Sequence, residues 1–507
     1  MARIDNLVEL VTDVALRQEL RQAVGTIRRR QRFGLVFEEH IPETSALQGY
    51  PLRKGAIVRR KAVASDRLYQ ISDLDSANAT IVPVSGDEAA ATVGLSELLV
   101  VKRFGDPIVA GLLPLDSVRR SENRPSHSVI SGENYHALQL LTFTHESKID
   151  LIYIDPPYNT GARDWKYNNN YVDNNDSWRH SKWLSFMEKR LLVAKRLLRS
   201  DGVMVITVDE NEHAHLVLLL ESLFPGADLT SVAIIHNPRG VQGDNFSYTN
   251  EFAVFVIPGG QKLIAPRRLS ESEQDPSNFR NWGGESLRTD AQNCFYPVSV
   301  EDGRVVGFGD VLPDGIHPAS DVVDLGNGRY EVWPIDRNGI ERKWRYARQS
   351  VEAIRGQLSV TTVRDGILQI RITKDAGQYK TVWQDPKYDA STHGTQLVNR
   401  LVGAEFPFPK SLYSTYEVLY ACTIRRPAAI ILDFFAGSGT TLHATCLLNA
   451  EDGGNRQCIL VTNNEVEEKQ ARKLNRAGLF RGDPEYERHG IFEQVTKLRC
   501  TAAITGM

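Results

Sequence analysis

A carboxylate, two prolines and an aromatic ring follow one apolar segment of this 507-residue chain. Residues 149–154 are apolar except for Asp150, and such a run is typical of a strand buried on both faces of a parallel sheet. Because two consecutive prolines cannot continue the backbone ladder, the chain must leave the sheet after this run. Asp155 and Tyr158 are therefore expected at the carboxyl end of a central strand, where ligands bind in open α/β sheets.

The sequence Asp155-Pro156-Pro157-Tyr158 resembles the catalytic signature of DNA amino-methyltransferases, which methylate the exocyclic nitrogen of adenine or cytosine. An aryl amine is a poor nucleophile, and the resemblance implies that the Asp155 carboxylate and the Pro156 carbonyl accept its hydrogens. Tyr158 offers a face for a base taken out of the duplex, and such stacking contributes about 1–3 kcal/mol. Alone, the tetrapeptide also fits a strand that ends in a proline turn with a structural Asp.

A second motif lies at residues 427–444, where an apolar run leads into a glycine turn and the start of a helix. Glycines there let the backbone approach a ligand closely. No Lys follows the second glycine, so the segment is not a Walker A loop, and Leu442 replaces the third glycine of a dinucleotide fingerprint. The segment resembles the S-adenosylmethionine loop of the same methyltransferases, with Phe434 where the family usually has Pro. The implied cofactor residues are Asp433, Phe435, Gly437, Ser438, Gly439 and Thr440.

The catalytic motif precedes the cofactor motif by more than two hundred residues. This order resembles the β group of amino-methyltransferases, in which a target-recognition region lies between the two motifs. The resemblance adds Glu133, Asn134 and Glu465 as cofactor contacts, and Phe408-Pro409-Lys410-Ser411 occupies the place of a family Lys-Pro segment. As a set, these features most resemble the modification (Mod) subunit of type III restriction systems.

The composition is that of an ordinary globular protein, with 41 % hydrophobic and 24 % charged residues and a net charge of −3. The five cysteines have neither metal-ligand nor disulfide spacing, so we expect no metal and a reducing, cytoplasmic location. We find no signal h-region and no apolar run long enough to span a membrane. The net charge does not decide whether the chain binds DNA, because large enzymes localise their basic face.

We expect four regions along the chain. Residues 1–115 form an accessory region with amphipathic helices over 1–35 and short strands over 50–115. Residues 116–260 form the catalytic half of the methyltransferase domain and include a helix from Trp178 to Arg199 with Trp183 in its core-facing stripe. A target-recognition region follows at 261–400, and 401–507 forms the cofactor-binding half, with a strand-like segment at 491–498 near its end.

The target-recognition region would read base edges in the major groove. Its basic cluster from 337 to 348 is interleaved with aromatic residues, although such clusters are more often solvated faces than phosphate contacts. In the family, the loop near residue 237 lines the target-base pocket. The candidate DNA contacts are Asn237, Arg280, Arg288, Arg342, Lys343 and Arg345.

The sequence therefore predicts an α/β protein with a Rossmann-like S-adenosylmethionine-dependent methyltransferase fold, in which helices cover both faces of a mixed, mainly parallel sheet. The implied activity is methylation of adenine N6 in double-stranded DNA as part of a restriction-modification system, with cytosine N4 as the alternative. A restriction helicase-nuclease and a second copy of the chain are possible partners. The alternatives from other classes are an RNA or protein-amide methyltransferase, a subunit that mainly docks the helicase-nuclease, and a nucleotide-binding oxidoreductase, which the Asp-Pro-Pro-Tyr sequence disfavours.

Overall fold

The computed structural model describes most of the chain from residue 44 onward and a few residues before it. The expected helices over 1–35 lie almost entirely outside the described residues, apart from a helical segment at 16–20. The described residues are 11, 13, 16–20, 44–47, 50–61, 67–85, 89–103, 111–120, 125–167, 170–173, 178–243, 245–363, 367–404 and 406–506.

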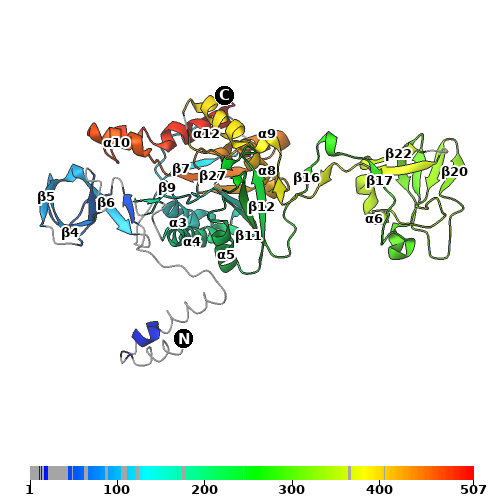
Figure 1. Cartoon of the computed structure of the whole chain (residues 1–507), viewed down its shortest axis with the longest axis horizontal. Coiled ribbons are helices and arrows are strands. Elements are labelled where there is room, and N and C mark those ends of the chain that lie inside the picture. The colour runs from blue at the N-terminus through cyan, green and yellow to red at the C-terminus, as the bar shows by residue number, and fades with distance from the viewer. Residues whose placement is uncertain are drawn as a thin grey trace. The chain divides into compact units, whose positions relative to one another are not determined.

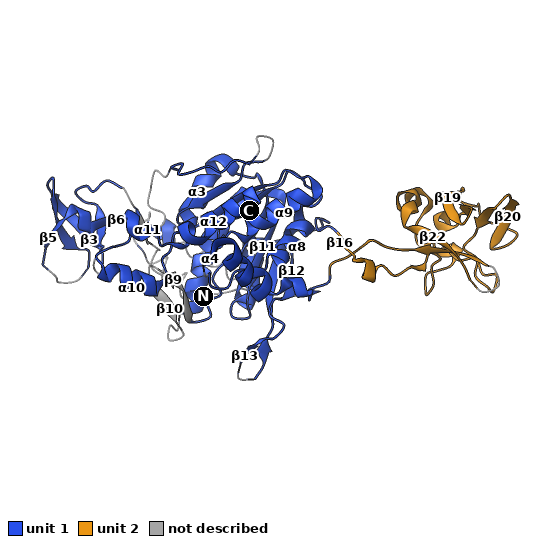
Figure 2. Cartoon of the chain, turned by 90° about the horizontal axis from the view of Figure 1, so that it is seen from above, with its two compact units in different colours: residues 1–265, 380–507 blue, residues 266–379 orange. Residues whose placement is uncertain are grey.

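The chain divides into two compact units (Figure 2). Unit 1 comprises residues 1–265 and 380–507, and unit 2 comprises residues 266–379. Unit 2 is thus an insertion within the chain of unit 1. Residues 380–400 belong to unit 1, because Val382 and Trp383 form a short strand that pairs with its main sheet.

The main sheet of unit 1 has eight strands and is mixed, as the sequence predicts. Seven of its strands run in the same direction, whereas β15 is antiparallel to both of its neighbours. The order across the sheet is β25 (Val382–Trp383), β12 (Ala227–Ile235), β15 (Asn250–Pro258), β11 (Leu198–Val208), β8 (Ile149–Ile154), β26 (Ile430–Asp433), β27 (Gln457–Thr462) and β7 (Ser128–Ser131).

Helices cover both faces of this sheet (Figure 1). On one face lie α3 (Asn134–His145), α4 (Arg179–Leu197) and α5 (His213–Leu223). On the other face lie α8 (Leu412–Thr423), α9 (Thr440–Asp452) and α12 (Lys497–Thr505). Shorter helices are α7 (Gln396–Val402), α10 (Glu468–Arg476) and α11 (Pro484–Glu487).

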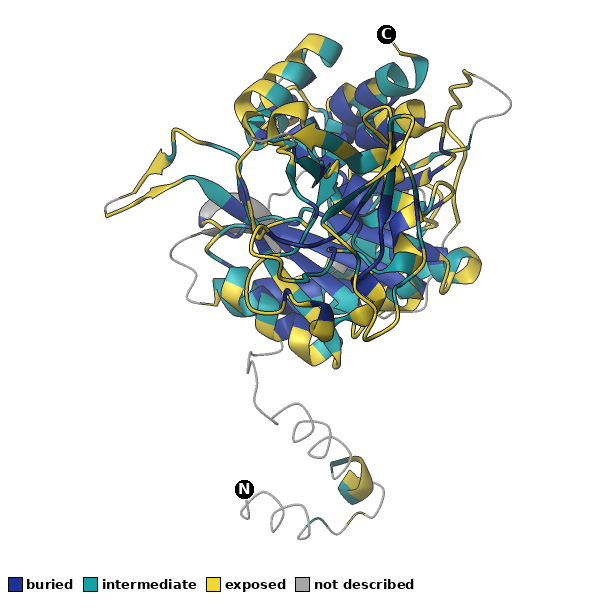
Figure 3. Ribbon diagram, turned by 90° about the vertical axis from the view of Figure 1, so that its right-hand side faces the viewer, coloured by how far each residue is buried: buried dark blue, intermediate teal, exposed yellow. Residues whose placement is uncertain are grey.

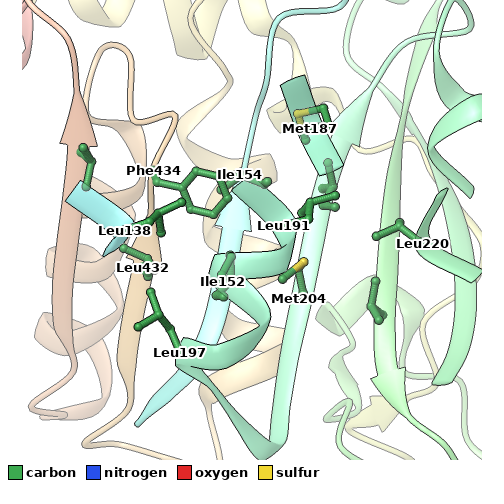
Figure 4. Packing of buried hydrophobic residues seen from close by; sticks show 14 of the residues in the cluster. Leu138, Ile152, Ile154, Met187, Leu191, Leu197, Met204, Leu220, Leu432 and Phe434 are labelled. Carbon is green, nitrogen blue, oxygen red and sulfur yellow. The ribbon is translucent and has the colours of Figure 1, made fainter. Parts of the chain in front are cut away.

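The core of unit 1 lies between the central strands and helices α3, α4 and α5. Ile152 and Ile154 of β8, Met204 of β11 and Leu432 of β26 meet side chains from all three helices (Figure 4). The central strands are buried, whereas the outer sides of the helices are exposed (Figure 3). This burial on both faces explains why the strand sequences are continuous apolar runs rather than alternating ones.

Helix α4 confirms the apolar stripe expected from the sequence, and Trp183 within it is fully buried. The helix ends at Leu197, two residues before the expected end. Leu198 already has extended backbone angles and pairs with Ile149, so strand β11 begins where the sequence suggested a last helical turn.

A second, antiparallel sheet is formed by residues 44–103 and confirms the expected β-rich region. Val58, Ile71, Ile81 and Val100 form its buried core. The strand order is β1 (Thr44–Leu47), β6 (Leu98–Arg103), β2 (Ile57–Arg60), β3 (Tyr69–Leu74), β4 (Asn78–Pro83) and β5 (Ala91–Gly94).

Unit 2 contains small antiparallel sheets around an aromatic core in which Phe279 stacks on Trp344 at a centroid distance of 5.0 Å. Its strands are β16 (Arg267–Arg268), β17 (Ser277–Asn278), β18 (Val298–Glu301), β19 (Arg304–Phe308), β20 (Val322–Gly326), β21 (Arg329–Val332), β22 (Leu358–Thr362), β23 (Leu368–Ile372) and β24 (Ala376–Gly377), and it also holds helix α6 (Arg348–Val351).

The strand expected at 491–498 is wrong. Residues Phe492–Thr496 form a helical turn that continues into α12. The buried side chains Phe492, Val495 and Arg499 recur every three to four residues, which is helical spacing. They pack one side of this segment against the rest of unit 1.

Among the described residues, no helix has both the length and the apolar composition needed to cross a membrane.

Two leucines on α5 offer a matched test of this core. Leu220 is fully buried, whereas Leu218 is 37 % exposed. We expect Leu220→Ala to lower the free energy of unfolding by about 2–5 kcal/mol, because it leaves a cavity between α5 and the sheet. Leu218→Ala should change it by less than about 0.5 kcal/mol. Denaturant unfolding followed by circular dichroism measures both, and equal losses would contradict this placement of α5.

Candidate active site

The two sequence motifs meet at one edge of the main sheet. Strand β8 ends at Ile154, directly before Asp155, and its neighbour β26 ends at Asp433, directly before the glycine turn. Because β8, β26, β27 and β7 are parallel, their carboxyl ends lie at the same edge. The catalytic motif and the cofactor motif therefore follow adjacent strands of the sheet.

The Asp155 carboxylate is held by one of its two oxygens. Thr207 donates its hydroxyl to Asp155 Oδ1 at 2.6 Å, and Lys410 Nζ lies 3.2 Å from the same oxygen. None of the described residues donates to Oδ2, and the side chain is 26 % exposed. Asp155 is therefore fixed in orientation and still has one acceptor oxygen for a ligand.

Lys410 is the centre of a buried charge cluster that comprises Asp155, Tyr158, Glu251 and Lys410. Its ammonium contacts the carboxylate of Glu251 and the hydroxyl of Tyr158, and it lies 4.6 Å from the Tyr158 ring centroid. Tyr158 donates its hydroxyl to Glu251 Oε2 at 2.9 Å. The exposed fractions of the Lys410 and Glu251 side chains are 12 % and 2 %, so water screens this cluster weakly.

Burial and mutual attraction shift the pKa values of these groups in a consistent way. Burial raises the pKa of Asp155; Lys410 opposes this shift and Glu251 adds to it. Burial alone would raise the pKa of Glu251, but Lys410 and His236 bring it below its usual value. Burial would lower the pKa of Lys410, yet Asp155 and Glu251 raise it. The Lys410 ammonium therefore stays charged between two carboxylates.

Trp183 holds the proline turn in place. Its indole nitrogen donates to the Pro157 carbonyl at 2.7 Å, which adds a polar contact to its expected role in the core. No described residue donates to the carbonyl of Pro156. The two prolines therefore differ in their partners: the Pro157 carbonyl is tied to α4, whereas the Pro156 carbonyl is not.

The glycine turn depends on two residues in the left-handed region, Gly437 at φ +47° and Gly439 at φ +81°. A Cβ on Gly439 would lie 2.9 Å from Cys500 Sγ on α12, and one on Gly437 would lie 3.2 Å from the Phe406 ring. Both positions therefore favour glycine for conformation, and Gly439 also lacks space for a side chain.

Asp433 shapes the same turn from inside the protein. Its Oδ1 accepts the backbone N–H of Phe435 at 2.9 Å, and its Oδ2 accepts the Thr441 hydroxyl at 2.6 Å. Burial raises the pKa of Asp433 to about 7, while these two hydrogen bonds oppose the rise. Asp433 thus organises the turn rather than facing the solvent.

The hydroxyl groups of Ser438 and Thr440 also have partners within the protein. Arg499, which is fully buried on α12, donates Nη1 to each hydroxyl oxygen at 2.8 Å. In the turn from 433 to 440, the partly exposed residues are Phe435 and Gly437. Of the expected cofactor residues in this turn, these two are accessible, and the others support them.

Glu133, Asn134 and Glu465 lie at the same edge of the sheet. Asn134 donates Nδ2 to the Phe434 carbonyl at 2.9 Å, directly before the glycine turn. The buried guanidinium of Arg190 donates to Glu133 at 2.7 Å and to Asn134 at 2.6 Å, which ties α4 to the start of α3. Glu465 follows β27, the strand next to β26.

The expected DNA contacts are more dispersed. Asn237 is partly exposed and follows β12 at the catalytic edge of the main sheet, whereas the other five lie in unit 2. Arg288 is buried there, and its guanidinium donates to Glu341 and to the carbonyl groups of Leu312, Pro313 and Ile316. The geometry therefore gives Arg288 a structural role in unit 2.

Arg280 and Arg342 flank an aromatic side chain. Each guanidinium carbon lies 5.0 Å from the Trp282 ring centroid, and Trp282 is 53 % exposed. Arg342 also pairs with Asp336 at 2.9 Å, and Arg280 donates to the Ile335 carbonyl. Lys343 is partly exposed, and Arg345, which is exposed, donates to Ser277 Oγ at 3.0 Å.

The sequence reasoning missed Glu251, Thr207 and the role of Lys410. A signal for Glu251 exists, because it is a charged residue at the start of the otherwise apolar strand β15. Nothing in the sequence places it next to Lys410, 159 residues away. That proximity arises because the tertiary fold brings the segment before α8 to the start of β15.

Comparison with known proteins agrees with this geometry. The sequence profile of the family described as DNA methylase matches residues 149–473. The chain is 29 % identical over 387 residues to the type II methyltransferase M.KpnI of Klebsiella pneumoniae, which covers 72 % of this chain and 86 % of that protein.

Two Mod subunits of type III restriction-modification enzymes are also similar. The EcoPI Mod subunit of Escherichia phage P1 is 27 % identical, over 71 % of this chain and 62 % of its own length. The StyLTI Mod subunit of Salmonella typhimurium is 27 % identical, over 71 % of this chain and 56 % of its own length. The chain thus spans less than two thirds of either Mod subunit. Because the family match covers more than half of the chain and both motifs, this chain belongs to the DNA methylase family.

Proposed function

We propose that this protein transfers a methyl group from S-adenosylmethionine to the exocyclic N6 of adenine in a base taken out of double-stranded DNA. The observation that carries this proposal is the state of Asp155. One of its oxygens is held by Thr207 and Lys410, and the other is available at the edge of the sheet beside the glycine turn. The Asp155 carboxylate can therefore accept a hydrogen bond from the amino group of the base, and it lies next to the glycine turn that would bind the cofactor.

The residues at the sheet edge fit S-adenosylmethionine. Phe435 and Gly437 are accessible in the glycine turn, and a Cβ on Gly437 would fill space near Phe406. Glu465 is an acidic residue at the end of the next strand, which suits ribose hydroxyls. These three residues would hold the cofactor, while Asp433, Ser438 and Thr440 shape the turn. When bound, the cofactor supplies an electrophilic methyl group on a sulfonium.

Asp155 and Pro156 prepare the amine for attack. Asp155 Oδ2 and the Pro156 carbonyl accept hydrogen bonds from the two amino hydrogens, which favours the pyramidal nitrogen with a directed lone pair. Thr207 and Lys410 keep Asp155 oriented, and its raised pKa makes the carboxylate a better proton acceptor. Asp155 Oδ2 therefore also takes the proton that the methylated nitrogen releases.

Tyr158 is the stacking surface for the extruded base. Its hydroxyl is held by Glu251 and Lys410, so its ring is fixed before substrate arrives. A fixed ring loses little conformational freedom on binding, and stacking then offsets part of the cost of flipping.

Adenine is preferred over cytosine because Asp precedes Pro-Pro-Tyr in this chain, as in adenine-specific members of the resembled family. Cytosine N4 methylation is the alternative, and it uses the same geometry. Incubation with S-adenosylmethionine and unmethylated DNA, followed by digestion and mass spectrometry of the nucleosides, distinguishes N6-methyladenine from N4-methylcytosine. Absence of both products would contradict the proposal.

Unit 2 is proposed as the target-recognition region. It is inserted between the catalytic and cofactor motifs, and the exposed Trp282 ring lies beside the partly buried guanidinium groups of Arg280 and Arg342, an aromatic and cationic arrangement suited to nucleic acid. The named relatives also support a place in a restriction-modification system, in which a helicase-nuclease subunit and a second copy of this chain are the proposed partners. Co-purification and mass measurement in solution test both partners.

Replacement of Asp155 tests the catalytic assignment. We expect Asp155→Ala to lower the methyl-transfer rate by at least about a hundredfold, because the amine loses its acceptor. Affinity for S-adenosylmethionine, measured by calorimetry, should stay largely intact. Asp228→Ala provides the control, because Asp228 caps Gly260 at the opposite edge of the sheet and should retain activity. Retained methyl transfer in Asp155→Ala would remove this residue from the mechanism.

Two substitutions at Tyr158 separate its ring from its hydroxyl. Tyr158→Ala removes a stacking contribution of about 1–3 kcal/mol, which corresponds to a roughly 5- to 150-fold loss on paired DNA. The loss should be smaller when the target base is mismatched, because that base is flipped more easily. Tyr158→Phe keeps the ring and should lose less than Tyr158→Ala. Single-turnover rates on both substrates measure these effects, and equal losses on both would refute the stacking role.

The Asp433 carboxyl should make stability depend on pH. Its pKa is raised from 3.8 to about 7 in the folded protein, so folding favours the protonated form. The contribution of Asp433 to stability is therefore present below about pH 4 and is lost as the pH rises through about 7, by at most about 1.4 kcal/mol per pH unit. Asp433→Asn should remove this dependence.

Calorimetric unfolding of the wild type and of Asp433→Asn across this pH range measures the difference. Asp73→Asn is the control, because the Asp73 side chain is 76 % exposed and its replacement should leave the wild-type profile unchanged. Parallel profiles for wild type and Asp433→Asn would show that Asp433 does not titrate in this range.

A further inference from the structure

Two histidines and a glutamate converge beside the catalytic turn. His180 lies in the first turn of α4, Glu212 directly precedes α5, and His215 lies in the first turn of α5. These two helices lie on the same face of the main sheet (Figure 1). One potential ligand atom from each residue lies within 4.8 Å of the other two. The three side chains come from two helices that the fold brings together.

The Glu212 carboxylate is completely buried. His180 Nδ1 lies 2.6 Å from its Oε1, which also accepts a hydrogen bond from Asn159 Nδ2. His215 Nδ1 lies 2.9 Å from Oε2, but that contact lacks hydrogen-bond geometry, and no described residue satisfies either of these two atoms. A buried carboxylate oxygen without a partner is costly. Positive charge must therefore enter this space, either as protons or as a metal ion.

We propose that His180, Glu212 and His215 bind a divalent transition-metal ion of the Zn²⁺ or Ni²⁺ type. Two imidazoles and one carboxylate are donors that suit these ions, whereas Mg²⁺ prefers oxygen ligands alone. The His180 and His215 side chains are 37 % and 35 % exposed, so the ion has a path of entry and room for water ligands. The cysteine pattern gave no indication of this site.

Binding at this site would fix the catalytic turn. Asn159 directly follows Tyr158, is fully buried, and has a left-handed backbone at φ +58°. Its side-chain amide donates to Glu212, so it would be an outer partner of the ligating carboxylate. The ion would therefore hold Glu212, Asn159 and the Tyr158 backbone in one arrangement.

Metal binding also requires a change of tautomer at His180. Arg179 Nε donates to His180 Nε2 at 3.2 Å, which places the proton of the neutral metal-free ring on Nδ1. A metal ion at Nδ1 requires that proton to move to Nε2, so the contact with Arg179 Nε must be released on binding.

The test uses the full-length chain without a histidine tag, freed of metal with a chelator. Titration calorimetry with Zn²⁺ should give one site per chain, and the thermal unfolding midpoint should rise. Mg²⁺ should do neither. His180→Ala and His215→Ala should each weaken Zn²⁺ binding by more than roughly a hundredfold, and Asn159→Ala by roughly 10- to 100-fold.

His317→Ala is the matched control. His317 Nδ1 lies 2.8 Å from Glu341, as in the candidate site, but the described residues place no second imidazole beside that pair. Its replacement should leave Zn²⁺ affinity unchanged. The absorption spectrum of the Co²⁺-loaded wild type gives a reading that does not depend on any variant folding, and it should indicate imidazole ligation.

Two results would overturn the proposal. One is the absence of Zn²⁺ and Ni²⁺ binding by the wild type, which would mean that protons on the imidazoles balance Glu212. The other is binding that persists in both His180→Ala and His215→Ala. Neither reading uses methyl transfer, so failure of the proposed function and failure of this metal site are distinguished.

Discussion

The ammonium group of Lys410, buried between Asp155 and Glu251, is the interaction on which the candidate active site depends. Two carboxylates this close and this weakly hydrated repel each other, and a single positive charge between them removes that repulsion. Loss of that charge would leave buried, unpaired carboxylates, an arrangement that costs several kcal/mol. The cluster also holds the hydroxyl of Tyr158. One charge therefore sets the ionisation of the acceptor and the position of the ring.

Around this cluster, backbone geometry is fixed by buried side chains that do not face the edge of the sheet. Trp183 holds the Pro157 carbonyl, Asp433 holds the glycine turn, and Arg190 joins α4 to the start of α3. Arg499 holds the same turn from α12. Each contact satisfies a buried polar group that the turn would otherwise leave without a partner. Within the glycine turn, Phe435 and Gly437 are the partly exposed residues, because the side chains of the others bond to the protein interior or are buried.

Unit 2 shows the same use of arginine in a different setting. Arg288 donates hydrogen bonds to three carbonyl groups and one carboxylate in the interior of unit 2. Its planar guanidinium has five N–H donors, so a single side chain can satisfy several acceptors there. A basic residue in a recognition region is thus not by itself a nucleic-acid contact. Trp282 with Arg280 and Arg342 is the part of this basic set in which an aromatic ring is exposed.

The sequence by itself determined the fold class, the main strands and the two motifs at their ends. Apolar runs, prolines and glycines determine the local backbone structure. Strands and turns can therefore be predicted from them without knowledge of tertiary contacts. The family that these motifs resemble is the one to which the chain belongs. The segment at 491–498 was misassigned although its apolar residues Ile491, Phe492, Val495 and Leu498 have the spacing of one helix face.

Tertiary structure alone decided which residues meet. Glu251 and Lys410 are 159 residues apart and adjoin because β15 and the segment before α8 lie near the end of β8. Ser438 and Thr440 turn toward Arg499 because α12 packs beneath the glycine turn. The cluster of His180, Glu212 and His215 arises because the starts of α4 and α5 lie beside each other. Such contacts depend on strand order and helix packing, which local sequence patterns do not encode.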